Sequence, residues 1–460
     1  HETQKAFETY WNNRSQDKGN GWKPFKRWEY YMESQVDEDG NPRDPDHNLK
    51  EYKRYFKLDS KSSVLQEETH WQELGPITLP ANGTGQPNGL GRINCVGFHP
   101  TNPNILYVGA ASGGLWKTTN GGSTWEVLTD TLPTLAVSSI VVNPQNPNVI
   151  YLGSGDRDGN DAPGLGVYKS TDAGATWYAS NTSMGNRVVG KLLLHPGDTS
   201  LLLAATNGGI YKSTNAGNTW SRTSSNSSHY KDMEFMPGNP SVVYATYGGR
   251  FYRSINTGDS WTQITNGLPS ASRCVIGVTP DDSTIVYALL TNNRTFKGLY
   301  RSTNGGLNFS VRSTSPNIMD YSSNGSGTSG QAWYDLCIAV DPDDKDVVYA
   351  GGVNIFKSTN AGSTWSINAH WTGSNAPDIH ADQHELDFSP DGKLYSSNDG
   401  GLYVTSNGGN TWIDKSSGLG IAQVYKIGQS ALSGSLTING YQDNGTAINN
   451  GNWKTEIGGD

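Results

Sequence analysis

The octapeptide STNAGNTW at residues 213–220 is one copy of a pattern that recurs along the chain and decides its fold. Each copy has Ser or Thr first, Asn or Asp third, Gly fifth and an aromatic residue last. Successive copies start 41 to 56 residues apart, close to the period of about 40 to 50 residues of four-stranded propeller blades. The other copies are TTNGGSTW (118–125), STDAGATW (170–177), SINTGDSW (254–261), STNGGLNF (302–309), STNAGSTW (358–365) and TSNGGNTW (405–412).

The residue types of this pattern predict a hairpin turn. An Asn or Asp side chain accepts hydrogen bonds from the backbone that follows it and so closes a local turn. Glycine supplies a positive φ angle that other residues resist. The final aromatic residue then enters a strand, where we expect it to pack into its own blade. We therefore interpret the pattern as structural and not catalytic.

Each copy lies in the same frame of short apolar runs. In one unit KLLLHP (191–196), LLLAAT (201–206), GIYKST (209–214) and TWSRT (219–223) follow one another. Such β-branched and aromatic runs between turn signals indicate strands, and the proline ends the first of them because it cannot donate to a sheet. We predict an all-β fold, a β-propeller with at least seven four-stranded blades.

Two segments bear on how the ring of blades closes. An eighth unit at 422–457 reads AQVYKIGQ, SLTINGYQ, GTAINN and NWKTEI and lacks the repeated turn. The segment HWQELGP (70–76) resembles an outermost strand that arrives before the first blade. We expect it to complete the last blade as a latch, which would remove exposed sheet edges. The propeller is thus predicted over 70–460, with the chain possibly continuing beyond it.

Residues 1–69 form a separate part that lacks the repeat. Phe7, Tyr10 and Trp11 suit one stripe of a helix, and Asp46 is a plausible N-cap of a later helix. We predict a short helical N-terminal arm. Two roles stay open: packing on the propeller, or docking a partner of a surface assembly.

Composition excludes several functions. The formal net charge of the 460 residues is −9 and no long basic run occurs, which argues against nucleic-acid binding. No apolar stretch approaches the length of about 18 residues expected of a membrane span. The three cysteines lie in different repeats, so we expect buried thiols and no disulfides.

Three long connections are the candidate functional region, because long loops on a rigid scaffold usually carry binding. They span 153–166, 310–333 and 366–383, and we expect them to share one face of the propeller. In an extended chain His380, Asp382 and His384 would point to one side. Two imidazoles and a carboxylate could hold a transition metal, and a polar cluster that fixes the loop is the alternative.

The same loops offer oxygen ligands and aromatic faces for a ligand. Calcium or a sugar could use the acidic set of the first loop, although a loop that satisfies its own backbone explains these residues equally well. Exposed aromatic side chains could stack on sugar rings or anchor the loops. The predicted binding residues are Asp156, Asp158, Asp161, Asp320, Tyr321, Trp333, Trp371 and Asp443.

The seven copies resemble the Asp boxes, or BNR repeats, of sialidases, sortilin-type propellers and xyloglucanase-type tandem propellers. The stretch from Gly91 to Trp125 (GRINCVGFHPTNPNILYVGAASGGLWKTTNGGSTW) is most similar to the last two groups. HADQHELDF (380–388), NDGGLYVTSNGGNTW (398–412) and the arm WKPFKRWEYYMES (22–34) are similar to secreted, glycosyl hydrolase-like proteins of Bacteroidetes. The resemblance implies a secreted or cell-surface location.

The resemblance does not carry over a catalytic residue. Xyloglucanase-type enzymes have a catalytic Asp before the Gly-Gly of the first blade, where this chain reads AASGG (110–114), and the sialidase proline is absent from GRIN (91–94). We therefore expect a non-catalytic module that binds protein or polysaccharide on its loop face. A glycoside hydrolase acting on extracellular polysaccharide and a structural subunit of a surface assembly remain the alternatives.

Overall fold

The computed structural model describes residues 2–12, 14, 21–33, 35–37, 39–44, 47, 50, 51, 54 and 73–459 except 160, 161 and 434. The chain divides into two compact units, His1–Trp71 and Gln72–Asp460. The first unit contains α1 (Glu2–Trp11) and α2 (Trp22–Glu33). Phe7 of α1 stacks on Phe25 of α2 with ring centroids 3.5 Å apart, while Tyr10 stays 54% exposed. The helix expected after Asp46 lies largely outside the described residues.

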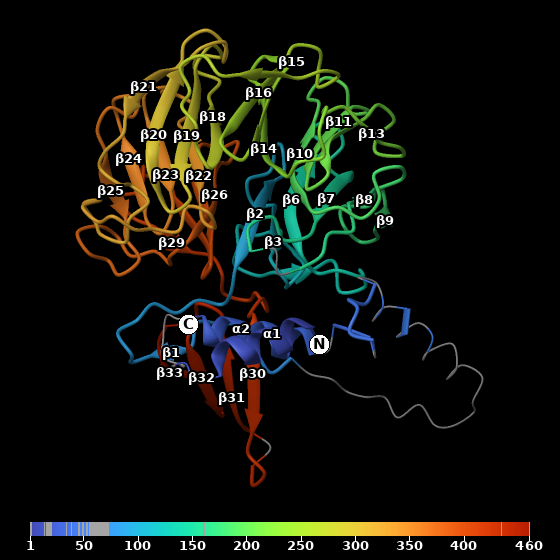
Figure 1. The fold of residues 1–460 in the computed structure, drawn as a ribbon, viewed down its shortest axis with the longest axis vertical. Coiled ribbons are helices and arrows are strands. Elements are labelled where there is room, and N and C mark those ends of the chain that lie inside the picture. The colour runs from blue at the N-terminus through green and yellow to red at the C-terminus, as the bar shows by residue number, and fades with distance from the viewer. Residues whose placement is uncertain are drawn as a thin grey trace. The chain divides into compact units, whose positions relative to one another are not determined.

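The second unit contains seven four-stranded antiparallel sheets, counted over the described part of the chain, arranged as the blades of a ring (Figure 1). Each blade uses four consecutive strands, and its first strand is the innermost. Blades 1 to 4 consist of β2 (Ile93–Phe98), β3 (Leu106–Ala110), β4 (Leu115–Thr118), β5 (Glu126–Val127); β6 (Val137–Val142), β7 (Ile150–Ser154), β8 (Val167–Ser170), β9 (Tyr178–Ala179); β10 (Val189–Leu194), β11 (Leu202–Thr206), β12 (Gly209–Ser213), β13 (Ser221–Arg222); and β14 (Tyr230–Met236), β15 (Asn239–Tyr247), β16 (Arg250–Ser254), β17 (Thr262–Ile264).

The remaining three blades follow the same order. They consist of β18 (Arg273–Val278), β19 (Val286–Asn292), β20 (Thr295–Ser302), β21 (Ser310–Ser313); β22 (Cys337–Val340), β23 (Val348–Gly351), β24 (Ile355–Ser358), β25 (Ser366–Ala369); and β26 (Gln383–Phe388), β27 (Leu394–Asn398), β28 (Gly401–Thr405), β29 (Ile413–Asp414). The predicted all-β propeller of four-stranded blades is thereby confirmed.

Seven blades close the ring. The innermost strand of blade 1, β2, contacts β26 of blade 7 as well as β6 of blade 2. Each pair of neighbouring blades encloses its own apolar cluster, and the cluster at the closure joins residues such as Val108 of blade 1 to Leu402 of blade 7. Burying such a side chain contributes about 1.5–3 kcal/mol, so closure rests on side-chain packing.

The seven repeated octapeptides form the turns between the third and fourth strands. In every copy the Ser or Thr hydroxyl accepts the backbone N–H of the glycine at 2.8–3.0 Å. The glycines have φ angles between 77° and 98°, as the pattern predicted. The indoles differ from expectation. Trp220 and Trp261 donate their Nε1–H to the preceding blade, to Ser180 O (2.6 Å) and Thr223 Oγ1 (3.1 Å), because the turn lies beside that blade's outer strand.

The eighth unit forms a further sheet with the order β1-β33-β32-β31-β30. Its strands are β30 (Val424–Gln429), β31 (Leu436–Tyr441), β32 (Thr446–Asn450), β33 (Trp453–Ile457) and β1 (Ala81–Asn82), which pairs parallel to β33. The strand predicted over 70–76 does not form in its described part, because residues 73–76 are not in a strand and blade 7 has its own fourth strand. Residues 70–72 lie outside the described residues.

The three cysteines agree with the expectation of buried thiols. Cys95, Cys274 and Cys337 are free and buried, and burial raises the pKa of each thiol. They therefore act as small apolar side chains. None of the helices in the described ranges is long and apolar enough to cross a membrane.

Candidate functional site

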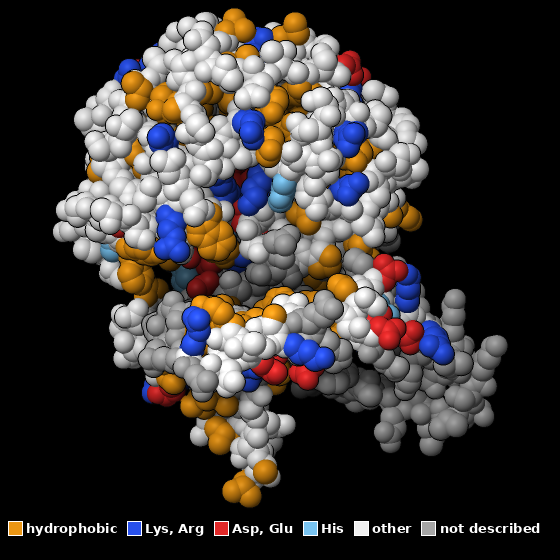
Figure 2. Space-filling model, viewed as in Figure 1, with side chains coloured by type: hydrophobic (Ala, Val, Ile, Leu, Met, Phe, Trp, Pro, Cys, Tyr) orange, Lys and Arg blue, Asp and Glu red, His pale blue; other side chains and the backbone are white. Residues whose placement is uncertain are grey.

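The innermost strands surround a cavity of about 860 Å³ on the axis of the ring. Figure 2 shows the centre of the ring hollowed, with Lys or Arg and Asp or Glu side chains inside the hollow. The cavity wall continues along the inner strands to Pro280, Pro342 and Pro390, which follow strands β18, β22 and β26. Ligand pockets usually have volumes of about 300–1,000 Å³, so this cavity has the size of a binding site.

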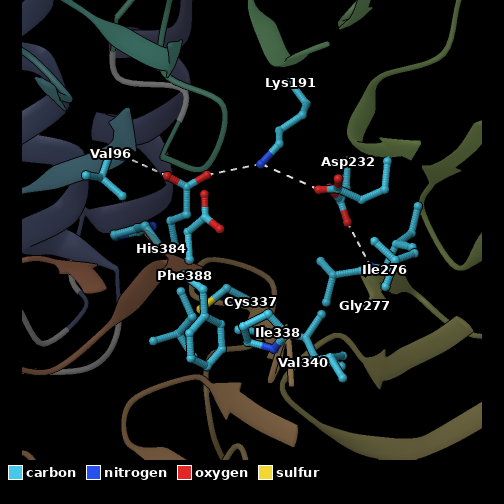
Figure 3. Close-up of a pocket in the computed structure, with 18 of the residues that line it drawn as sticks. Val96, Lys191, Asp232, Ile276, Gly277, Cys337, Ile338, Val340, His384 and Phe388 are labelled. Atoms are coloured by element: carbon cyan, nitrogen blue, oxygen red, sulfur yellow. Dashed lines mark hydrogen bonds and ion pairs between the residues drawn. The ribbon is translucent and has the colours of Figure 1, made fainter. Parts of the chain in front are cut away.

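A lysine and several carboxyl groups share the cavity. Lys191 Nζ lies 3.2 Å from Glu385 Oε1 and 3.6 Å from Glu234 Oε1, and Figure 3 shows two dashed lines running from its nitrogen. The other oxygen of Glu385 accepts the backbone N–H of Val96 at 2.8 Å. These three side chains come from the inner strands of blades 3, 4 and 7. They meet because alternate residues of a strand point to the same side, here toward the axis.

Burial shifts the protonation of the cavity acids. It raises the pKa of Glu234 to about 8, against the opposing effect of Lys191. It also raises the pKa of Asp387 to about 7. Burial would lower the pKa of Lys191, but Glu385 and Glu234 raise it above its usual value. Near neutral pH the cavity therefore combines a largely protonated Glu234 and a partly protonated Asp387 with a charged ammonium.

Arg157 lies at the inner end of this cavity and joins four blades. Its Nη2 donates to the carbonyls of Asn94 (3.0 Å) and His384 (2.8 Å), and its Nη1 to those of Ser138 and Gly190 (both 3.2 Å). These acceptors belong to the inner strands of blades 1, 7, 2 and 3. A planar guanidinium with five donors suits this role.

His384 links two buried aspartates next to Arg157. Its Nε2 lies 2.7 Å from Asp399 Oδ1 and its Nδ1 lies 3.3 Å from Asp158 Oδ2. Burial would lower the pKa of His384, but the two carboxylates raise it. Burial likewise opposes ionisation of Asp399, yet His384 and Arg92 hold its pKa at about 2. The trio is therefore an ion-paired network in which both imidazole nitrogens are engaged.

Asp158 and Asp399 are each held by further partners. Asp158 also contacts Arg273 (2.8 Å) and Arg157 (3.2 Å), which keep its pKa well below the usual value although burial opposes this. Asp399 accepts the phenol of Tyr334 at 2.8 Å, and Tyr334 in turn accepts from Arg92 at 2.8 Å.

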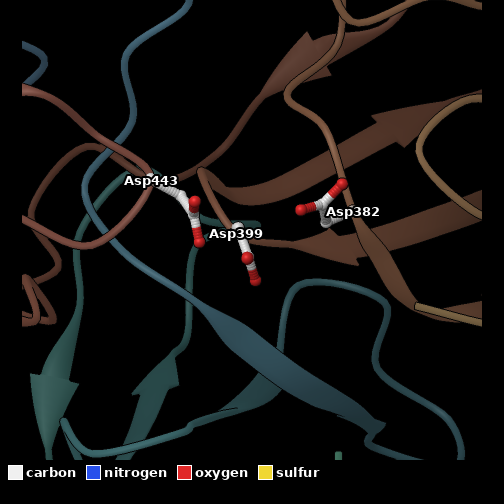
Figure 4. A group of neighbouring side chains, drawn as sticks. All are labelled: Asp382, Asp399 and Asp443. Carbon is white, nitrogen blue, oxygen red and sulfur yellow. The ribbon is translucent and has the colours of Figure 1, made fainter. Parts of the chain in front are cut away.

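A second carboxylate group adjoins this network. Oxygens of Asp382, Asp399 and Asp443 lie within 4.8 Å of one another, and Figure 4 shows the three side chains converging from separate segments. Asp382 precedes β26, Asp399 lies in the turn between β27 and β28, and Asp443 lies between β31 and β32. Burial and the charge of Asp399 raise the pKa of Asp382 to about 7.

The predicted metal residues are near this group but do not converge as a set. Asp382 has a φ of 66° and β26 starts only at Gln383, so the expected extended run over 380–384 is wrong. The kink sends His384 toward Asp158 and Asp382 toward Asp399 and Asp443. His380 Nδ1 contacts the carbonyl of Ala381 at 3.3 Å. Metal binding by His380, Asp382 and His384 stays a prediction.

The predicted acidic binding residues lie in different parts of the structure, with Asp443 in the carboxylate group described above. Asp156 pairs with Arg92 at 2.6 Å and, like Asp158, is buried inside the network. Asp320 accepts the backbone N–H of Gly327 at 2.6 Å and so closes its own loop. Asp161 lies outside the described residues.

The aromatic residues lie toward the surface, where Tyr321 is 42% and Trp333 50% exposed. Trp371 Nε1 donates to the carbonyl of Tyr321 at 3.2 Å, which joins the loops 310–333 and 366–383. Their stacking on a sugar stays a prediction.

Most of the charged residues on the axis were not predicted from the sequence. They come from several inner strands and strand connections, and two or three of them share a strand in β14 and in β26. Alternation of charged residues in apolar strands was the available signal. The missed residues are Arg92, Arg157, Lys191, Lys231, Asp232, Glu234, Arg273, Asp335, Glu385, Asp387 and Asp399.

Seven radial four-stranded blades around an axial cavity define this protein as a β-propeller. No protein-family profile matches the chain, and no curated protein matches its sequence.

Solved structures similar to the chain include three GH74 enzymes. They include the GH74 xyloglucanase of Xanthomonas campestris (16% identity, TM-score 0.60, covering 78% of this chain and 59% of that one). An ancestral GH74 enzyme has 18% identity and a TM-score of 0.61 over 82% of this chain and 55% of that one. The GH74 enzyme of Niastella koreensis has 20% identity and a TM-score of 0.56 over 81% and 60%. The chain thus spans somewhat more than half the length of these neighbours, and at such identity the likeness concerns the fold.

Proposed function

We propose that this chain is a secreted or cell-surface β-propeller that binds polysaccharide in its axial cavity. The observation that carries the proposal is the cavity wall, where Lys191, Glu234 and Glu385 lie together with the aromatic rings of Phe98 and Phe388. Sugars are bound by hydrogen bonds to their hydroxyl groups and by contact with aromatic rings. The cavity, with a volume of about 860 Å³, provides both polar groups and aromatic rings for such contacts.

Binding to defined polysaccharides tests this function. Xyloglucan is the first to try, because one structural neighbour is a xyloglucanase, followed by other soluble plant and bacterial glycans. We expect titration calorimetry to detect binding that weakens on the order of tenfold in Lys191→Met and Glu385→Gln, as for the loss of one charged hydrogen bond. The exposed Glu126→Gln is the matched control. Absence of binding across the panel, or equal binding by all variants, would overturn the proposal.

A second candidate function is glycoside hydrolysis in the same cavity. It is favoured by the pKa of Glu234, which is raised to about 8. Glu385 lies on the other side of Lys191, whose Nζ contacts both carboxyl groups. A protonated carboxyl and a carboxylate are the pair that glycoside hydrolysis uses. Release of reducing ends that disappears in both Glu234→Gln and Glu385→Gln would support an enzyme. Binding without release in the wild type would leave a binding module.

A further inference from the structure

The carboxylate group of Asp382, Asp399 and Asp443 has the features of a cation site. Its three residues come from the approach to β26, the β27–β28 turn and the β31–β32 turn, and one oxygen of each lies within 4.8 Å of the others. Asp382 and Asp399 are 7% and 2% exposed, while Asp443 is half-buried and gives solvent a route to the group. We propose that Asp382, Asp399 and Asp443 bind a calcium ion.

A fourth carboxyl group supports the proposal independently. Asp335 is 1% exposed and interacts with the side chain of Asp382. No N–H or O–H group of the described residues donates to either of its oxygens or to Oδ1 of Asp382, so a shared proton is the only link between these two carboxyl groups. Buried polar groups without partners are costly. A cation bound by Asp382, Asp399 and Asp443 would replace that proton as the partner of the Asp382 oxygens.

Charge balance around the group favours the same ligand. On one side Asp399 faces His384, whose pKa is raised, and Arg92. These two are already paired with Asp158 and Asp156. On the other side neither Asp335 nor Asp382 makes an ion pair with any described residue. Neighbouring buried carboxylates repel one another unless protons or a cation neutralise them.

The donor set selects calcium among the common metal ions. All donors are oxygens, which hard cations prefer. Calcium binds oxygens at about 2.3–2.6 Å in a flexible geometry, whereas magnesium binds at about 2.0–2.1 Å and demands a near-ideal octahedron. A transition metal would prefer imidazole, but both ring nitrogens of His384 are engaged with Asp158 and Asp399.

Calcium binding is tested with the ion alone and without any sugar, so its outcome is separate from that of the proposed function. The chelator-treated protein is titrated with calcium chloride by calorimetry, and its thermal unfolding is recorded with and without the ion. We expect one bound calcium per chain and a Tm rise of at least about 3 °C at a hundredfold excess over Kd. Asp382→Asn and Asp443→Asn should each weaken binding on the order of tenfold or more.

A control and a second readout keep the test decisive. Asp387→Asn changes a half-buried carboxyl group on β26, the strand that follows Asp382, outside the site, and it should bind calcium like the wild type. In chelator, Asp382→Asn should unfold at the same or a higher temperature than the wild type, because it removes repulsion. Absence of a calcium-dependent Tm rise in the wild type, or undiminished binding when Asp382 and Asp443 are both replaced, would overturn the proposal.

Discussion

Trp125 donates its indole Nε1–H to the backbone carbonyl of Lys415, 2.9 Å away and 290 residues later in the chain. This bond joins blade 1 to blade 7 at the closure of the ring. Trp125→Phe keeps most of the apolar contact and removes the bond. We expect the free energy of unfolding in urea to fall by about 1 kcal/mol beyond the cost of the smaller ring.

Trp177 supplies the matched control for this substitution. It occupies the same position in the turn of blade 2 and is also half-buried, but its Nε1 has no hydrogen-bond partner among the described residues. Trp177→Phe therefore reports the cost of the smaller ring alone. Equal losses in the two variants would show that the bond to Lys415 does not stabilise the closure.

The backbone at Gly89 packs closely against the turn between β27 and β28. A Cβ atom on Gly89 would lie 2.2 Å from the Cα of Gly400, whereas one on Gly83 would meet nothing within 4 Å. Gly89→Ala forces the backbones apart, so we expect a loss of about 2 kcal/mol or more in chemical unfolding. Gly83→Ala, in the same segment, should change stability by less than about 0.5 kcal/mol. A neutral Gly89→Ala would contradict this close approach.

Glu234 should make stability depend on pH. Burial raises its folded pKa from 4.5 to about 8, so between these pH values the folded chain holds a proton that the unfolded chain has lost. The free energy of unfolding contributed by this group therefore falls as pH rises through that window. Glu234→Gln should flatten the profile measured by urea unfolding from pH 5 to 8.5. Glu126→Gln should follow the wild type, and an unchanged slope in Glu234→Gln would contradict the raised pKa.

His384 should stabilise the protein most at low pH. Its folded pKa is raised by Asp399 and Asp158 against the effect of burial. Because the imidazole pKa is raised, its contribution to the free energy of unfolding is complete below the unfolded-state pKa of about 6.5. It is lost as pH rises through the folded-state pKa. His384→Gln leaves two buried carboxylates without this partner, so we expect a loss of about 3 kcal/mol at pH 5.5.

The pH dependence of that loss is the readout specific to the ion pairs. The difference between wild type and His384→Gln should shrink in urea unfolding as pH rises above about 6.5. His99→Gln changes a half-buried histidine whose ring accepts backbone N–H groups of the following turn, and its cost should be smaller. A loss in His384→Gln that is constant with pH would point to packing instead of charge.

The fold was readable from the sequence because its signals are local. The hydroxyl of Ser213 and the amide of Asn215 act within their own octapeptide, and glycine is required there by a positive φ. The strands between the turns follow from short apolar runs. The number of blades that close the ring was not readable, since closure depends on packing between Val108 and Leu402, which lie far apart in the chain.

The candidate site was only partly readable because its contacts are long-range. His384 meets Asp158 across 226 positions, and neither residue's neighbours in the sequence identify the other. Alternation of Asp232 with Glu234 and of Glu385 with Asp387 marked charged residues facing the axis, but only the ring geometry places them around one cavity. The positive φ of Asp382 bends the 380–384 segment, so that its side chains do not alternate as in an extended strand. The sequence around Asp382 does not predict this positive φ.

The parallel pairing of β1 with β33 has a mechanical consequence. The chain passes through this small sheet on its way into the ring and again after leaving it, with Ala81 opposite Lys454. Tension applied between residues 73 and 459 would reach the β1–β33 pair first and load it in shear. The blades would bear little of this force until that pair had ruptured. We therefore expect the small sheet to protect the propeller from mechanical unfolding when the chain is pulled from these two ends.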